Sequence, residues 1–202
     1  MVKIKICGIT NIEDYNNALS LGVDFTGFIF YEQSKRYIKP EQVRKIKRNN
    51  ICSHKRVGVF VNERIEIIKE VYELADLDII QLHGEESPEY CQILNLPYWK
   101  CIRVKNYDSI NLIRKYSATK ILIDTYSDNL YGGTGKSIDL LLVKEALATE
   151  KEIIVAGGIS YRNVKDIINL KPYGIDINSC IEKYPGKKDF KKMSELIKII
   201  RG

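Results

Sequence analysis

The sequence predicts an α/β protein built as a single-domain (β/α)8 (TIM) barrel. Eight short segments rich in β-branched residues recur along the 202 residues, and an amphipathic segment follows each of them. Strands that alternate with helices pair in parallel, because each crossover returns the chain to the same edge of the sheet. Eight such repeats favour a sheet that closes on itself, and no linker-like segment divides residues 1–202.

The predicted strands are short runs separated by turn residues and helical patterns. In chain order they are Lys3–Cys7, Phe25–Phe30, Arg56–Val61, Asp78–His83, Tyr98–Val104, Lys120–Asp124, Glu152–Ala156 and Gly174–Asn178. An open doubly wound sheet is the alternative. Its dinucleotide fingerprint, G-x-G-x-x-G, is missing after the first strand, where the chain reads Cys7-Gly8-Ile9-Thr10.

Helix signals fill the segments between the strands. Thr10 with Glu13 forms a capping box for the first helix, and Gly22 ends that helix. Pro40 and Pro88 suit the first helical position, the latter behind Ser87 as the cap. Apolar residues at helical spacing predict core-facing helices at Ile65, Ile68, Val71, Tyr72 and Ala75, and at Phe190, Met193, Leu196, Ile197 and Ile200.

Composition and charge place the chain among soluble globular proteins without a nucleic-acid partner. Hydrophobic residues make up 45% and charged residues 29%, and the net charge is +6. A basic protein can attract nucleic acid, but the most basic stretch, Arg44–Arg56, has no aromatic residue for stacking on bases. We therefore expect this stretch to be a solvated helix end and loop.

Cysteine usage and the lack of long apolar runs predict a cytoplasmic protein. The five cysteines are odd in number, widely scattered and without a C-x-x-C pair, so neither a disulfide framework nor a zinc site is expected. The chain has no signal-peptide core and no apolar run of about 18 residues. We expect no bound metal and no membrane association.

Polar residues occur where buried parallel strands are usually apolar. Isoleucines on one face of a strand are expected to pack on helices, so the other face points into the barrel, and its last polar residue lies at the carboxyl end. Cys7, His83, Asp124 and Asn178 would then converge on the mouth where barrel enzymes place their active sites. Taken singly, a cysteine is more often a buried hydrophobe and a strand-end aspartate a cap.

Deeper in the same strands, Lys5 and Asp176 are expected to form a buried ion pair, because an unpaired charge there would be very costly. Two late loops, Ala156–Ser160 and Asn178–Glu182, are candidates for phosphate binding, a common use of the loops after strands seven and eight. The plainer alternative is that Gly157 and Gly158 only shape a tight turn.

The glycine-rich segment Gly132–Ser137 suggests a nucleotide-binding loop but departs from that motif. The pattern G-x-x-x-x-G-K-[ST] requires glycine at position 130, where Leu130 stands. We expect a loop beside Asp124 that can cover a bound substrate.

Taken together, these motifs resemble the phosphoribosylanthranilate isomerase family of tryptophan biosynthesis. The matching segments run in order over nearly the whole chain: Lys5–Thr10, Gly27–Phe30, Ser34–Ile38, Gly58–Asn62, Gln81–Gly84, Leu122–Thr125, Gly132–Lys136, Ala156–Ile159 and Gly174–Ser179. The resemblance implies an Amadori rearrangement of N-(5-phosphoribosyl)anthranilate to 1-(2-carboxyphenylamino)-1-deoxyribulose 5-phosphate, without a cofactor.

By matching position, Asp124 would be the general acid, Cys7 the general base, and Arg36 would hold the anthranilate carboxylate. The other substrate-binding positions implied are His83, Gly157, Gly158, Asp176, Asn178, Ser179 and Cys180. A free thiol of pKa about 8.5 is mostly protonated at pH 7, so Cys7 would need a nearby dipole or cation. The family usually has glycine at position 180 and often an aromatic residue at position 140, where this chain has Cys180 and Leu140.

Other functions fit the sequence less well. A triosephosphate-type isomerase would need glutamate at the end of strand six and lysine near the end of strand one, where Asp124 and Cys7 stand. The barrels that isomerise the aminoaldose of histidine biosynthesis typically use two aspartates. A barrel that binds a phosphosugar without turning it over stays open, as does the choice between monomer and homodimer.

Overall fold

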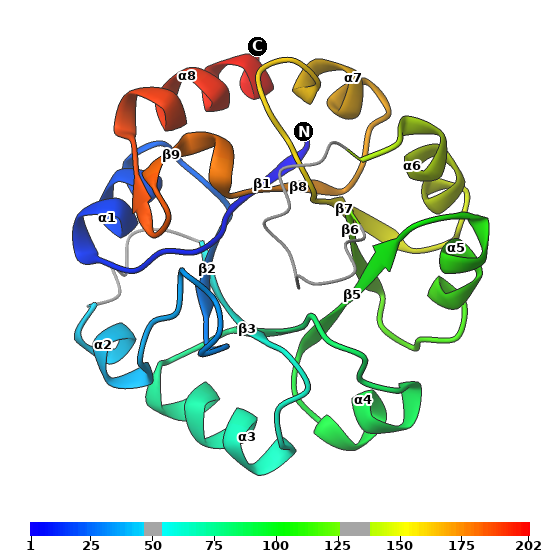
Figure 1. The fold of residues 1–202 in the computed structure, drawn as a ribbon, viewed down its shortest axis with the longest axis horizontal. Coiled ribbons are helices and arrows are strands. Elements are labelled where there is room, and N and C mark those ends of the chain that lie inside the picture. The colour runs from blue at the N-terminus through cyan, green and yellow to red at the C-terminus, as the bar shows by residue number, and fades with distance from the viewer. Residues whose placement is uncertain (47–53, 126–137) are drawn as a thin grey trace.

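A closed ring of eight parallel strands forms the centre of the molecule (Figure 1). The computed structural model describes residues 1–46, 54–125 and 138–202. The strands are β1 (Lys3–Ile6), β2 (Phe25–Ile29), β3 (Lys55–Phe60), β4 (Ile79–Leu82), β5 (Tyr98–Val104), β6 (Lys120–Thr125), β7 (Glu152–Val155) and β8 (Gly174–Ile177). The ring closes where β8 pairs with β1, so the predicted (β/α)8 barrel is confirmed.

Helices surround the ring and cover its outer face (Figure 1). They are α1 (Ile12–Ser20), α2 (Pro40–Lys45), α3 (Ile65–Leu74), α4 (Pro88–Leu94), α5 (Tyr107–Ile113), α6 (Leu140–Leu147), α7 (Val164–Asn169) and α8 (Phe190–Arg201). Pro40 and Pro88 take the first helical position as predicted, and the Ser87 side chain accepts from the Tyr90 amide. No helix in the described ranges is long and apolar enough to cross a membrane.

The cap predicted for α1 is wrong by one residue. Asn11 is the N-cap, and its Oδ1 accepts from the Asp14 amide at 2.9 Å. Thr10 does not cap the helix, because its hydroxyl donates to the Gly186 carbonyl instead. A contact with the far end of the chain therefore decides between two neighbouring residues that can each cap a helix.

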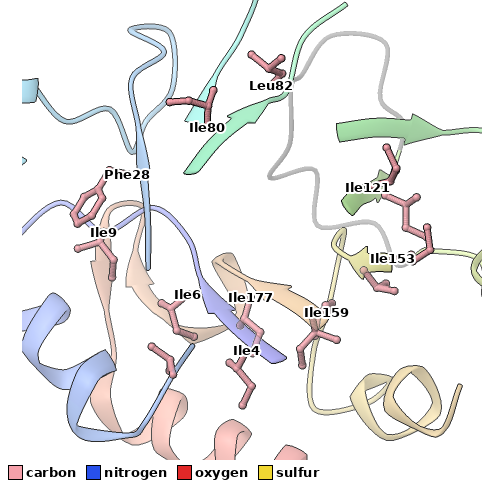
Figure 2. Packing of buried hydrophobic residues seen from close by; sticks show 14 of the residues in the cluster. Ile4, Ile6, Ile9, Phe28, Ile80, Leu82, Ile121, Ile153, Ile159 and Ile177 are labelled. Carbon is pink, nitrogen blue, oxygen red and sulfur yellow. The ribbon is translucent and has the colours of Figure 1, made fainter. Parts of the chain in front are cut away.

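The alternation within the strands separates two apolar layers. The isoleucine and leucine side chains at the second and fourth residues of β1, β4 and β8 face the helices and belong to the large outer core. Figure 2 shows Ile4, Ile6 and Ile177 gathered from the adjacent strands β1 and β8. A smaller cluster fills the barrel interior and consists of Phe25, Val57, Trp99, Cys101, Leu122, Ile154 and Ala156. The predicted inward and outward faces are confirmed, and the remaining interior positions carry polar side chains.

Arg56 corrects the prediction for the basic stretch. Arg44 and Lys45 are exposed as expected, and residues 47–53 lie outside the described residues, but Arg56 is 1% exposed in β3. Its guanidinium donates to the Ile46 carbonyl and to the Tyr15 hydroxyl, and it lies 5.1 Å from the Tyr15 ring centroid. The charge is tolerated because these groups satisfy its donors.

A small unpredicted unit follows β8 before the last helix. It consists of a 3-10 turn, η1 (Ser179–Ile181), and a hairpin of β9 (Glu182–Tyr184) and β10 (Lys187–Lys188). In Figure 1 the hairpin lies beside α1, on the side of the barrel where β1 and β2 end. This unit supplies side chains to the barrel mouth, as described below.

Candidate active site

The carboxyl ends of the strands bring the predicted polar residues to one rim of the barrel. Cys7, His83 and Asn178 each stand one residue after their strand, and Asp124 is the penultimate residue of β6. Because all eight strands are parallel, these positions share one end of the barrel. Cys7, His83 and Asp124 are 5%, 7% and 4% exposed, so the thiol, imidazole and carboxyl group are largely shielded from water.

Gly27 on β2 makes room for the side chains of β1. A methyl group at this position would come within 2.8 Å of Cys7 Sγ and 3.0 Å of Lys5 Nζ. The thiol and the ammonium group therefore face the same space in the barrel. Residue types larger than glycine would push one of them aside.

Lys5 and Asp176 form the predicted buried ion pair. Lys5 Nζ donates to Asp176 Oδ2 at 2.8 Å, and both side chains are almost completely buried. They are also register partners where β1 meets β8. Asp176 Oδ1 is buried and has no hydrogen-bond partner within the described part of the chain, which leaves an acceptor for a group brought by a ligand.

Opposing influences act on the Cys7 thiol. Burial raises its pKa above the ordinary value, the Lys5 ammonium lowers it, and the Asp176 carboxylate raises it. Burial prevails, so the pKa of Cys7 stays raised. For Lys5, burial lowers the pKa, but Asp176 and Cys7 outweigh burial and hold the pKa of Lys5 above its usual value.

Asp124 contacts His83 and the following residue of its own strand, and the loop after β7 lies close to it. Its Oδ2 lies 3.2 Å from His83 Nε2, and its Oδ1 accepts from the Thr125 amide at 2.7 Å. Gly157, in the loop after β7, adopts φ +84°, and a Cβ there would lie 2.8 Å from Asp124 Oδ1 and 2.2 Å from Thr125 Oγ1. Only glycine lets this loop approach the carboxyl group so closely.

His83 is fixed on both ring nitrogens. Gln81 Nε2 lies 2.8 Å from Nδ1, and the Cys101 sulfur lies 3.5 Å from Nε2. Burial lowers the pKa of His83, but Cys101 and Asp124 outweigh it and hold that pKa well above its ordinary value. Gln81 Oε1 has no partner among the described residues; a half-turn of the amide would bring it to Nδ1, the arrangement that an imidazolium requires.

Arg36 lies across the mouth next to Cys7. Its stem packs on Gly8, where a Cβ would come within 2.7 Å of Arg36 Cδ and 3.0 Å of Asn178 Oδ1. Gly8 adopts φ +71°, which favours glycine for a second reason. The guanidinium forms a bidentate pair with Glu182, with Nε to Oε1 at 2.8 Å and Nη2 to Oε2 at 2.7 Å.

Sequence reasoning did not find this partner of Arg36. Glu182 also accepts from Lys188 Nζ at 3.1 Å, and the same ammonium group donates to Asn178 Oδ1 at 2.8 Å. A signal was present, because Pro185-Gly186 marks a turn that brings Lys188 back beside Glu182. Only the fold brings that hairpin to Arg36.

The loops after β7 and β8 have the backbone features of an anion site. Gly157 and Gly158 both have positive φ, and the amides of both lack an acceptor within residues 1–46, 54–125 and 138–202. In the neighbouring loop, after β8, η1 begins at Ser179, and Cys180 is half-buried. Burial raises the pKa of Cys180 to about 11, so this thiol is neutral and does not repel an anion.

Two further predictions concern loops and metals. The segment Gly132–Ser137, expected to cover the substrate, lies outside the described residues. Within the described ranges no three His, Cys, Asp or Glu side chains are grouped as metal ligands would be.

The family model described as N-(5'phosphoribosyl)anthranilate (PRA) isomerase matches residues 4–199. The chain belongs to the phosphoribosylanthranilate isomerase family. An N-(5'-phosphoribosyl)anthranilate isomerase of Trichlorobacter lovleyi is 39% identical over 199 residues, which are 98% of this chain and 97% of the relative.

Solved structures of phosphoribosylanthranilate isomerases agree with this placement. The enzyme of Thermotoga maritima superposes with a TM-score of 0.91 at 36% identity, over 100% of both chains. A second structure, at a TM-score of 0.84, 35% identity and 100% coverage of both chains, is an isomerase in complex with reduced 1-(o-carboxyphenylamino)-1-deoxyribulose 5-phosphate. The ligand of that relative carries an aromatic carboxylate at one end and a phosphate at the other.

Proposed function

We propose that this chain isomerises N-(5-phosphoribosyl)anthranilate to 1-(2-carboxyphenylamino)-1-deoxyribulose 5-phosphate, with Cys7 as general base and Asp124 as general acid. One observation carries the proposal. In a member of the phosphoribosylanthranilate isomerase family, a buried thiol and a buried carboxyl group stand at the carboxyl ends of β1 and β6, on the same rim.

The first step opens the ribose ring. Asp124 donates a proton to the ring oxygen while the bond from C1 to that oxygen breaks, and the lone pair on the anthranilate nitrogen forms the C=N bond of a protonated Schiff base. The position of Asp124 is held by the Thr125 amide, and His83 lies against its other oxygen. A positioned acid of this kind contributes about 10² to 10⁴ in rate.

In the second step the Cys7 thiolate takes the proton from C2 of the sugar. The electrons of the C–H bond form a C1=C2 double bond and neutralise the iminium nitrogen, which gives an enolamine that tautomerises to the ketone. The pKa of Cys7 is raised by burial, which makes the thiolate scarce but a stronger base once formed. The Lys5 ammonium, beside the thiol at Gly27, stabilises that thiolate.

Substrate binding is divided among the remaining residues. Arg36 would hold the anthranilate carboxylate, and the backbone amides of Gly157, Gly158, Ser179 and Cys180 would hold the phosphate. The unpartnered Asp176 Oδ1 suits a sugar hydroxyl or the bridging amine as donor, and Asn178 and His83 line the rim beside it. The chemistry uses no cofactor, and a cytoplasmic location would keep the Cys7 thiol reduced.

A fluorescence assay tests the proposal. Purified protein should remove the fluorescence of N-(5-phosphoribosyl)anthranilate, whereas Cys7→Ala and Asp124→Asn should each lower turnover by about 10² to 10⁴. Near-normal turnover in either folded variant would reject the role of that residue. A wild-type protein that binds the reduced product analogue but leaves the substrate unchanged would identify a non-catalytic phosphosugar-binding barrel instead.

A further inference from the structure

Arg36 and Glu182 meet side-on, and this geometry divides the guanidinium into a used edge and a free edge. Glu182 takes Nε and Nη2 at 2.8 and 2.7 Å, which accounts for two of the five N–H donors of an arginine. The remaining donors are on Nη1 and Nη2, and they have no acceptor in the described part of the chain. These two nitrogens form the outer edge of the fork, which can itself bind a carboxylate in bidentate fashion.

Glu182 is fixed independently of Arg36. Its Oε1 accepts from Lys188 Nζ at 3.1 Å and from the Gly186 amide at 3.2 Å, and its side chain is 4% exposed. Both donors belong to the hairpin that begins with Glu182 itself. The hairpin therefore anchors the carboxylate of Glu182. The direction in which its two oxygens face Arg36 is set without Arg36.

The stem of Arg36 is also restricted. It packs on Gly8, immediately after Cys7, and the guanidinium end is held by Glu182. An arginine held at both ends loses little further conformational entropy when it binds a ligand. The pair shifts the pKa of both partners. Burial raises the pKa of Glu182, but Arg36 and Lys188 outweigh burial and hold it below its ordinary value, and Glu182 raises the pKa of Arg36.

We infer that Glu182 is a positioning residue that holds the Arg36 guanidinium side-on and leaves its Nη1/Nη2 edge for the aromatic carboxylate of the substrate. The inference rests on the proposed function, because it assumes that Arg36 binds this carboxylate. Through Glu182, the β9–β10 hairpin becomes part of the recognition of the anthranilate group. Glu182 itself does not touch the reacting atoms.

Two ligands and one variant test the inference. The ligands are reduced 1-(o-carboxyphenylamino)-1-deoxyribulose 5-phosphate and its counterpart without the carboxylate, reduced 1-phenylamino-1-deoxyribulose 5-phosphate. The wild-type protein should bind the carboxylated compound at least about 10-fold more tightly, because hydrogen bonds between charged groups are worth at least that factor. In Glu182→Gln, which keeps the size of the side chain but loses its charge, this preference should fall to within about 3-fold.

Asp24→Asn is the matched control. Asp24 resembles Glu182 in accepting from a lysine (Lys3, 2.8 Å), an arginine (Arg201, 3.3 Å) and a backbone amide (Ile4, 2.9 Å). It directly precedes β2 and so lies at the opposite end of the barrel from the mouth. Its loss should lower stability without changing the preference for the carboxylated ligand.

The outcomes separate the inference from the proposed function. If the wild-type protein prefers the carboxylated ligand and folded Glu182→Gln keeps that preference, the positioning role of Glu182 is rejected while Arg36 keeps its own role. If the wild-type protein shows no preference, Arg36 does not bind the carboxylate, and the roles assigned to Arg36 and to Glu182 are both rejected. A preference lost equally in Asp24→Asn would show a general effect of instability and would also reject the inference.

A measurement on the wild-type protein removes any dependence on how the variant folds. The Arg36 Nε–H should exchange slowly with water while Glu182 accepts its proton, and this proton can be followed by nitrogen-15 NMR. On saturation with the carboxylated compound, exchange at Nε–H should stay within about 3-fold of its rate in the free protein. A large acceleration would mean that the ligand displaces Glu182, which contradicts the inference.

Discussion

His83 Nε2 lies 3.2 Å from Asp124 Oδ2, and the pair is enclosed by Gln81, Cys101 and the Gly157 loop. The imidazole is supplied by β4 and the carboxylate by β6, two strands separated in the ring by β5. The pair lies on one side of the mouth, and the pair of Arg36 and Glu182 belongs to the elements on the other side, around β1, β2 and the hairpin. Substrate held by the rim would therefore lie between two buried polar networks.

The pH dependence of stability should reveal the His83–Asp124 pair. The pKa of His83 in the folded protein is raised well above about 6.5, its value in an unfolded chain, because Cys101 and Asp124 outweigh burial. A raised pKa contributes stability that is complete below pH 6.5 and is lost as the pH rises through the folded pKa. Urea unfolding of wild type and His83→Gln should show a stability difference that shrinks from pH 6 to pH 9; a constant or growing difference would contradict the pairing.

The ionisation of Cys7 gives a second prediction. Burial raises its pKa, and the Lys5 ammonium only partly reverses this, so the free protein should hold Cys7 as a thiol at neutral pH. The thiolate absorbs near 240 nm, and the difference in absorbance between wild type and Cys7→Ser isolates its titration. The inflection should lie above the ordinary thiol value of about 8.5. An inflection below pH 8 would show that the nearby cations prevail over burial.

The fold could be predicted from the sequence because its signals are local. Alternating isoleucines in short strands define which face is outside, and once the ring closes, Lys5 and Asp176 become register partners. The Arg36–Glu182 pair could not be predicted in this way, because Glu182 begins a hairpin that is not part of the barrel repeat. The wrong cap at Thr10 has the same cause, since the Gly186 carbonyl that accepts from Thr10 lies in the turn of that hairpin.

Gly157 provides a test of the approach between the β7 loop and Asp124. Gly157→Ala would place a Cβ 2.2 Å from Thr125 Oγ1 and 2.6 Å from its amide nitrogen, at φ +84°. Gly22→Ala is the control, because Gly22 has φ +68° and nothing within 4 Å of the added Cβ. The control should lose about 1 to 2 kcal/mol through backbone strain alone, and Gly157→Ala about 1 to 3 kcal/mol more through the collision. Equal losses in urea unfolding would argue against the close approach.

The buried pair of Lys5 and Asp176 predicts strong coupling between two substitutions. Lys5→Met leaves the Asp176 carboxylate buried without its partner, and this should cost about 3 to 5 kcal/mol of unfolding free energy. Adding Asp176→Leu should recover most of that loss, because an apolar pair of similar volume replaces the buried charges at little net cost. Lys3→Met is the control on the same strand: its partner Asp24 is 19% exposed and Lys3 itself 47%, so its removal should cost no more than about 1 kcal/mol. If the double variant loses as much unfolding free energy as the sum of the two single variants, Lys5 and Asp176 do not interact in the folded protein. The Lys5 ammonium would then not be fixed beside Cys7 by Asp176.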